Sequence, residues 1–145
     1  MSSARKLRLV VTIVGIALLA LFKWTQRAPV DAITAPPQAI AEAFRARASN
    51  VQVSGVGVVR RVLPDDNEGS RHQRFILELS DGQTVLVSHN IDLAARLSAL
   101  DRGDTVEFFA EYDWNANGGV IHWTHHDPAR RHVDGWLKHE GRIVR

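Results

Sequence analysis

The feature that most constrains the fold is a change, after residue 50, to strict alternation of apolar and polar residues. Five stretches show it: VQVSGVGVVRRV, RFILELS, QTVLVSH, DTVEFFAEYDW and GVIHW. Alternation with a period of two turns one side of an extended chain toward a core, so each stretch predicts a β-strand. The sequence therefore predicts a mainly β domain over residues 51–145.

Turn and helix-capping residues between these stretches indicate how the strands are connected. Asp81-Gly82 and Asn117-Gly118 are typical of hairpin turns. Between the third and fourth stretches lies NIDLAARLSALDRGD, where Asn90 can cap an inserted helix that Arg102-Gly103 would end. The predicted order is three strands, one helix and two strands.

This order is that of an OB-fold, a five-stranded Greek-key barrel that is partly open. Gly55 and Gly57 suit the strongly coiled first strand that such a barrel requires. A plain β-sandwich of two separate sheets is the alternative. We expect the five-stranded OB-like barrel.

An uncharged apolar run, LVVTIVGIALLALF at residues 9–22, precedes this domain. Arg5, Lys6 and Arg8 come before the run, and the bulky sequence FKWTQR at its end offers no small-residue cleavage site. We therefore expect residues 1–27 to be an uncleaved transmembrane anchor in the cytoplasmic membrane. Because basic residues stay on the cytoplasmic side, the domain would lie outside, in a periplasm.

Residues 28–50 are expected to form a linker and a short helix. The linker contains prolines, and the Ala-rich run QAIAEAFRARA begins directly after Pro37. Proline is favoured at the first position of a helix, so the helix should begin there.

The charge distribution argues against a general nucleic-acid-binding protein. The chain has 18 Lys and Arg and 16 Asp and Glu, for a formal net charge of +2. Residues 1–32 hold five of the basic residues and one acid, which leaves 13 basic and 15 acidic residues for the rest. A domain that binds phosphates normally carries a basic surplus itself.

Side-chain alternation also assigns faces to the predicted strands. On the second and third strands it places His72, Arg74 and His89 on the outer face, with Arg71 directly before them. Part of the outer face of an OB-fold is the usual ligand surface. We therefore expect a binding module whose ligand contacts these four residues. The opposite face would form the core, with Phe75, Leu77, Leu86, Val106, Phe108 and Trp123.

The stretch IHWTHHDP gathers three histidines and an acid at the end of the fifth strand. Alternation places His122 on the outer face beside Asp113 and Glu111. The chain has no cysteine, so a divalent metal would need His, Asp or Glu ligands. Candidate ligands are His122, His126, Asp127 and His89, and a metal-dependent hydrolase acting on phosphodiesters is the alternative function. Surface or hydrogen-bonded structural histidines are the simpler interpretation.

Six segments together, RHQRFILEL, SHNIDLA, GDTVEF, AEYDWN, HWTHHDP and HVDGWLKHEG, carry a resemblance to known proteins. Residues 51–141 resemble a family of bacterial exported proteins whose domain has no known function. The resemblance implies a domain of that family and assigns no activity. More loosely, the chain resembles secreted OB-fold nucleases and small periplasmic OB-fold binding proteins, but the catalytic arrangement of those nucleases has no residue-by-residue match here.

Overall fold

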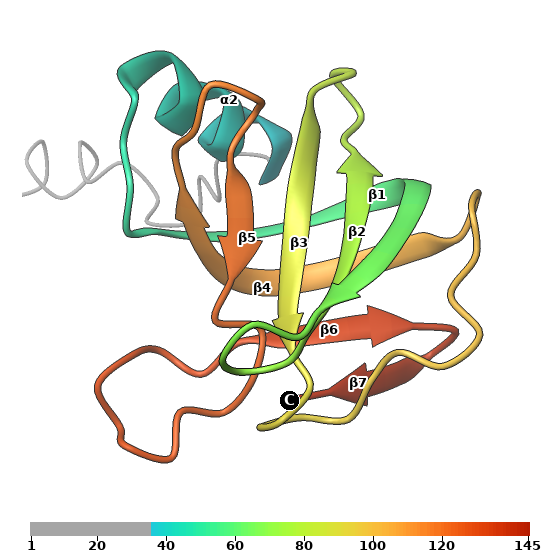
Figure 1. The fold of residues 1–145 in the computed structure, drawn as a ribbon. Coiled ribbons are helices and arrows are strands. Elements are labelled where there is room, and N and C mark those ends of the chain that lie inside the picture. The colour runs from blue at the N-terminus through green and yellow to red at the C-terminus, as the bar shows by residue number, and fades with distance from the viewer. Residues whose placement is uncertain (1–35) are drawn as a thin grey trace, which may run out of the picture. The chain divides into compact units, whose positions relative to one another are not determined.

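The computed structural model describes residues 36–145, which form one α-helix and seven β-strands (Figure 1). The predicted short helix and the five predicted strands are present, and the tail adds two further strands that alternation did not place. The described part of the chain is therefore mainly β. Its elements are α2 (Pro36–Ala46), β1 (Val51–Asp66), β2 (His72–Glu78), β3 (Thr84–Asn90), β4 (Thr105–Asp113), β5 (Val120–His122), β6 (Trp136–His139) and β7 (Arg142–Val144).

The predicted membrane anchor at residues 1–27 and the start of the predicted linker lie outside the described residues. Within residues 36–145, no helix is both long and apolar enough to cross a membrane.

Strand β1 is long enough to pair with two neighbours. Residues 51–58 pair antiparallel with β4, and residues 58–66 pair antiparallel with β2. Strands β2, β3, β5 and β4 continue the pairing, so that five strands form a ring. The ring is not evenly closed, because parallel strands β3 and β5 share only the pairs Leu86–Val120 and Val87–Ile121.

Two glycines let β1 bend closely around the ring. A Cβ on Gly55 would lie 2.6 Å from Cζ of Phe108, and a Cβ on Gly57 would lie 2.9 Å from the carbonyl oxygen of Glu78. Both distances are shorter than normal contact, so a side chain at either position would push β1 away from its neighbours. The coiled first strand expected from these glycines is present.

The C-terminal tail extends the sheet beyond the ring. Strand β6 pairs antiparallel with residues 106–109 of β4, and β7 pairs antiparallel with β6. In Figure 1 these two strands lie together below the ring. The five-strand prediction was therefore incomplete, since it left the tail, which holds a four-residue and a three-residue strand, unplaced.

The core is largely the one predicted. Phe75, Leu77, Val106 and Phe108 are fully buried inside the ring. Helix α2 contributes the buried residues Ile40 and Ala43 on one of its faces.

The face predicted for β3 was wrong. Leu86 is only half-buried on the outer face, whereas Val85 and Val87 are buried. The Asp81-Gly82 hairpin would need a two-residue loop to pair Leu77 with Leu86, but Leu77 pairs with Val85. The loop has one residue more, and a shift of one residue moves every side chain of a strand to the opposite face.

Trp123 was also predicted in the core, and this was wrong. In the core, Tyr112 pairs with Ile121, which is fully buried. Strand β5 ends at His122, and Trp123 follows with a φ of 51°. This left-handed conformation ends the alternation, so parity no longer determines where the Trp123 side chain lies.

The predicted inserted helix is absent from the described residues between β3 and β4. Asn90 does begin one turn, because its Oδ1 accepts hydrogen bonds from the N–H groups of Asp92 (2.9 Å) and Leu93 (3.2 Å). Further along, the buried Gln73 side chain donates to the carbonyl of Leu97 (3.0 Å) and accepts from its N–H (2.9 Å). These bonds take backbone groups that a helix would use internally.

Candidate functional site

A pocket of about 250 Å³ opens where the ends of three strands meet. Because β3 and β5 are parallel, their last residues lie at the same edge, and antiparallel β2 begins beside the end of β3. Figure 1 shows β3 and β5 pointing the same way. The lining consists of imidazole, indole, amide, hydroxyl and aliphatic groups from these ends and the segments that follow: His72, Ser88, Asn90, Leu93, His122, Trp123 and His125.

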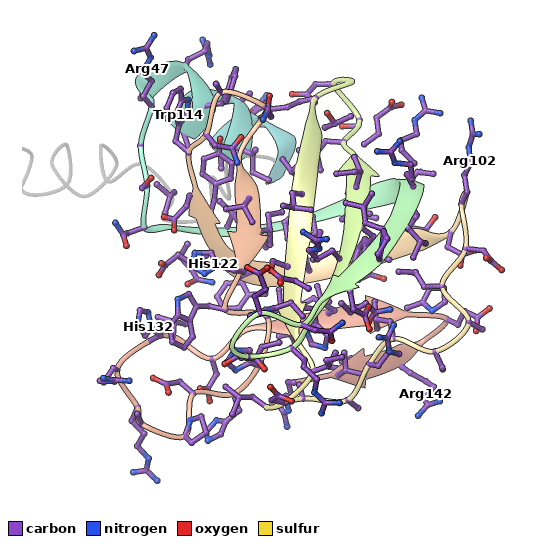
Figure 2. All side chains as sticks on the ribbon, in the orientation of Figure 1. Arg47, Arg102, Trp114, His122, His132 and Arg142 are labelled. Carbon is purple, nitrogen blue, oxygen red and sulfur yellow. The ribbon has the colours of Figure 1, made fainter. Side chains whose placement is uncertain are left out.

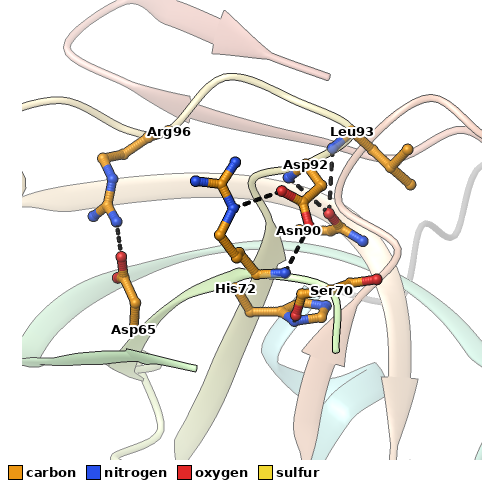
Figure 3. A network of polar contacts seen from close by, with 8 residues as sticks. Asp65, Ser70, His72, Asn90, Asp92, Leu93 and Arg96 are labelled. Carbon is orange, nitrogen blue, oxygen red and sulfur yellow. Dashed lines mark hydrogen bonds and ion pairs between the residues drawn. The ribbon is translucent and has the colours of Figure 1, made fainter. Parts of the chain in front are cut away.

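One side of the pocket is held by a network of polar contacts (Figure 3). Asp92 accepts hydrogen bonds from the N–H of Arg71 (2.8 Å) and from its Nε (2.7 Å). These bonds lower the pKa of the Asp92 carboxyl, so that it stays ionised. Nearby, His72 Nδ1 lies 2.7 Å from the carbonyl oxygen of Ser70. An ion pair joins Asp65, near the end of β1, to Arg96 in the segment between β3 and β4.

The four residues predicted to bind a ligand do not share one surface. His72 lines the pocket, and Arg71 lies beside it in an ion pair with Asp92. Arg74 pairs with the lining residue Ser88 on the outer face and donates from Nε to the carbonyl oxygen of Pro64 (3.1 Å), but it does not itself line the pocket.

The outer-face position predicted for His89 was wrong, because this residue is fully buried on the inner face of β3. The reason is the same as for Leu86. The hairpin loop has one residue more than predicted, so every side chain of β3 lies on the face opposite to the one predicted.

His89 instead contacts the backbone and side chains that hold the pocket lining from the core side. Its Nδ1 lies 2.7 Å from Oγ1 of Thr124, and its Nε2 lies 2.9 Å from the carbonyl oxygen of Ala95. Burial lowers the pKa of His89 below its usual 6.5. The ring is therefore neutral, donating from Nε2 to the carbonyl and accepting from the threonine hydroxyl. Because Thr124 lies between Trp123 and His125, His89 fixes the segment directly after β5, which carries two lining residues.

Trp123 lies at the centre of a group of imidazoles. Its ring stacks on His132 with a centroid distance of 3.6 Å and an interplanar angle of 16°. The rings of His125 and His122 lie at 5.5 and 6.3 Å, tilted by 44° and 45°. Sequence analysis missed this group, because it depends on the backbone conformation of Trp123 and on a loop contact.

That loop is folded by Asp127. Its carboxylate accepts hydrogen bonds from the N–H groups of Ala129 (2.9 Å), Arg131 (2.6 Å) and His132 (2.9 Å). These backbone bonds, led by that from Arg131, lower the pKa of Asp127. The Asp-Pro pair in the sequence is a turn signal of this kind, although it does not reveal that the turn returns His132 to Trp123.

The predicted metal ligands are not brought together. His126 is bonded to Asp134 at 2.6 Å, the Asp127 carboxylate is used within its own loop, and His89 is enclosed in the core. His122 does contact the predicted acids: its Nε2 lies 2.8 Å from Asp113 and 3.8 Å from Glu111. Within residues 36–145, one group of three side chains places possible metal-binding atoms within 4.8 Å of one another: Glu111, Asp113 and His122.

Comparison with known proteins gives a family and no activity. The family described as Protein of unknown function (DUF3465) matches residues 21–145, so the chain belongs to this family. The expected membership of a family with no known function is confirmed, and the match extends beyond residues 51–141. Neither the curated proteins nor the solved structures contain a match to the chain.

Proposed function

Taking membership of this family as the premise, we propose that the chain is a membrane-anchored extracytoplasmic binding module with an OB-like domain. The strand order supports the OB-like assignment, because β1-β2-β3-β5-β4 with β1 returning to β4 is the connectivity of a small five-stranded barrel. The bend of β1 at Gly55 and Gly57 fits the same architecture. Strands β6 and β7 are an addition to it.

The anchor is supported by the uncharged run at residues 9–22 and the three basic residues before it. Fractionation of cells that express the full-length chain is expected to recover it in the cytoplasmic membrane, with the domain accessible to protease only from outside. Replacing Leu18 and Leu19 by Arg should reduce membrane recovery, because each central charge is unfavourable by about 2.5 to 3.5 kcal/mol for insertion. Recovery of the unaltered chain in the cytoplasm would contradict the anchor.

The pocket is the observation that carries the binding function. It joins three imidazoles, His72, His122 and His125, to the indole of Trp123 in about 250 Å³. Imidazole, amide and hydroxyl groups can each donate or accept hydrogen bonds, and an indole supplies an apolar surface. Pockets that combine apolar walls with a few converging polar groups are the usual binding sites for small molecules. The fitting ligand is a small polar molecule with one apolar face.

Titration of the full-length labelled protein, in detergent micelles, with a library of small polar fragments tests this site. We expect NMR shift changes at Ser88, Asn90 and His125. Ser88→Leu should abolish them, because its side chain would fill the pocket. Ser54→Leu is the matched control, since Ser54 is also a half-buried strand serine but lies on β1, away from the pocket. Fragments that instead shift residues around Val56 would contradict the assignment.

The metal-dependent hydrolase alternative receives less support. It required His122, His126 and Asp127 to lie close to the residues predicted on the outer face, His72, Arg74 and His89. The side chains of His126 and Asp127 instead form hydrogen bonds within the loop after β5, so these contacts do not bring the required residues together.

A further inference from the structure

A second group of side chains lies next to the pocket, on the outer face of β4 and β5. Glu111 and Asp113 are two residues apart on β4 and therefore point to the same side. His122 on β5 pairs directly with Glu111 in the antiparallel register. Its Nε2 lies 2.8 Å from Oδ2 of Asp113 and 3.8 Å from Oε1 of Glu111.

The loop after β5 brings a fourth possible ligand to this group. His132 Nδ1 lies 3.6 Å from Oε2 of Glu111, and stacking on Trp123 holds the imidazole in place. Figure 2 shows His122 and His132 on the same side of the domain. Glu111 thus lies between two imidazoles, one from a strand and one from a loop. The four side chains are 15 to 32 % exposed, so an ion can reach them from solvent.

This group combines two carboxylates with two imidazoles, whereas the other histidine–carboxylate contacts within residues 36–145 are single pairs. Among residues 36–145, the ion pairs of Glu111 and Asp113 are with imidazoles alone. Two neighbouring carboxylates without a guanidinium or ammonium partner are a favourable place for a divalent cation, which can bind the carboxylate oxygens and the imidazole nitrogens together. Elsewhere in the described domain, two acids form single pairs with a histidine, Asp134–His126 and Asp104–His139, and four pair with guanidinium or ammonium groups: Arg60–Glu78, Arg71–Asp92, Arg96–Asp65 and Lys138–Glu107.

We propose that Glu111, Asp113 and His122, with His132 as a fourth ligand, form a binding site for a divalent transition metal ion of the zinc class. Ligand atoms about 2.1 Å from a tetrahedral zinc lie about 3.4 Å from one another. The separations of 3.6 and 3.8 Å are close to this value, and the 2.8 Å contact needs only a small movement. Imidazole with carboxylate suits zinc, nickel or iron better than calcium or magnesium.

The site differs from the pocket in its residues, although His122 belongs to both. Glu111 and Asp113 do not line the pocket, so replacing them tests the metal site alone. The proposal therefore stands independently of the small-molecule function.

The test is calorimetric titration of ZnCl₂ into the full-length chain, purified in detergent without a histidine tag and stripped with a chelator. We expect one zinc ion per chain. Glu111→Gln and His122→Ala should each weaken binding at least about tenfold, because each removes a ligand. Asp113→Asn serves as a further variant in case either of these does not fold, as judged by circular dichroism.

His126→Ala is the matched control. His126 forms a histidine–carboxylate pair with Asp134 at 2.6 Å, but it lies outside the proposed site. Its replacement should leave the zinc affinity unchanged. No zinc binding by the unaltered chain, equal affinity in the folded ligand variants, or an equal loss in His126→Ala would each overturn the proposal. Cobalt substitution gives a second readout, since tetrahedral ligation produces visible absorption bands that Glu111→Gln should remove.

Discussion

Replacing Phe108 with alanine is expected to lower the free energy of unfolding by about 3 to 5 kcal/mol. The Phe108 side chain is fully buried inside the ring of strands. Its phenyl group fills the space that Gly55 leaves open on β1, since a Cβ on Gly55 would lie 2.6 Å from Phe108 Cζ. Strand β1 is held here by its pairing with β4 along residues 51–58, which limits how far it can move into the vacated volume.

Urea titration of the full-length protein, followed by tryptophan fluorescence, measures this loss. Phe109→Ala is the matched control, because Phe109 is the next residue on β4, lies on the outer face and is only half-buried against Trp136. Its replacement should cost less than half as much. Equal losses for the two variants would mean that the inner and outer faces of β4 have been assigned wrongly.

The sequence predicted β4 well because the strand is long and its burial alternates without interruption. Val106 and Phe108 are inside and Glu111 and Asp113 are outside, as the alternation indicated. The contact of His122 with these acids was also predictable, because it needs only the identity of two neighbouring strands and the face of each.

The β2–β3 hairpin shows where such reasoning fails. Asp81-Gly82 correctly predicted a turn, but a turn signal does not fix the number of loop residues. One additional residue moved His89 from the predicted ligand surface into the core. The predicted outer-face cluster therefore lost one member, His89, while His72 and Arg74 lie on the outer face as expected.

The pocket depends on contacts that no local pattern records. The parallel pairing of β3 with β5 joins segments far apart in the chain, and it involves only two residue pairs. The return of His132 to Trp123 depends on three backbone hydrogen bonds to Asp127. The absence of the predicted helix also depends on a contact between distant residues. Asn90 makes the expected cap, but the buried side chain of Gln73 binds the backbone N–H and carbonyl of Leu97, which a helix would use internally.

Lowering the pH below about 6.5 is expected to destabilise the protein through His89. The folded state holds this imidazole neutral, with its pKa below 6.5 because of burial, whereas the unfolded chain has the usual pKa. The unfolded state therefore binds a proton in a pH range where the folded state does not. The contribution to stability is complete above the unfolded pKa and is lost as the pH falls from there toward the folded pKa. The limiting slope is about 1.4 kcal/mol per pH unit.

Comparison with the His89→Gln variant isolates the pH-dependent contribution of His89 to the free energy of unfolding. Glutamine cannot titrate, so the variant should lose less stability than the unaltered protein between about pH 7.5 and about pH 5.5. His126→Gln, at an exposed position, is the control and should keep the slope that His89 produces. At about pH 7.5 the His89→Gln variant should itself be less stable by about 1 to 3 kcal/mol for each partner, Thr124 or Ala95, that it leaves unbonded.

Protonation of His89 should also act on the pocket, because Nδ1 would then carry a hydrogen and could no longer accept from Thr124. The threonine hydroxyl would have to rotate, and the segment after β5 that carries Trp123 and His125 would lose this hydrogen bond. We expect the NMR signals of these two residues to shift with acidic pH in the unaltered protein and to shift less in His89→Gln. Identical pH dependence of stability in both proteins would show that His89 does not limit the stability of this fold in acid.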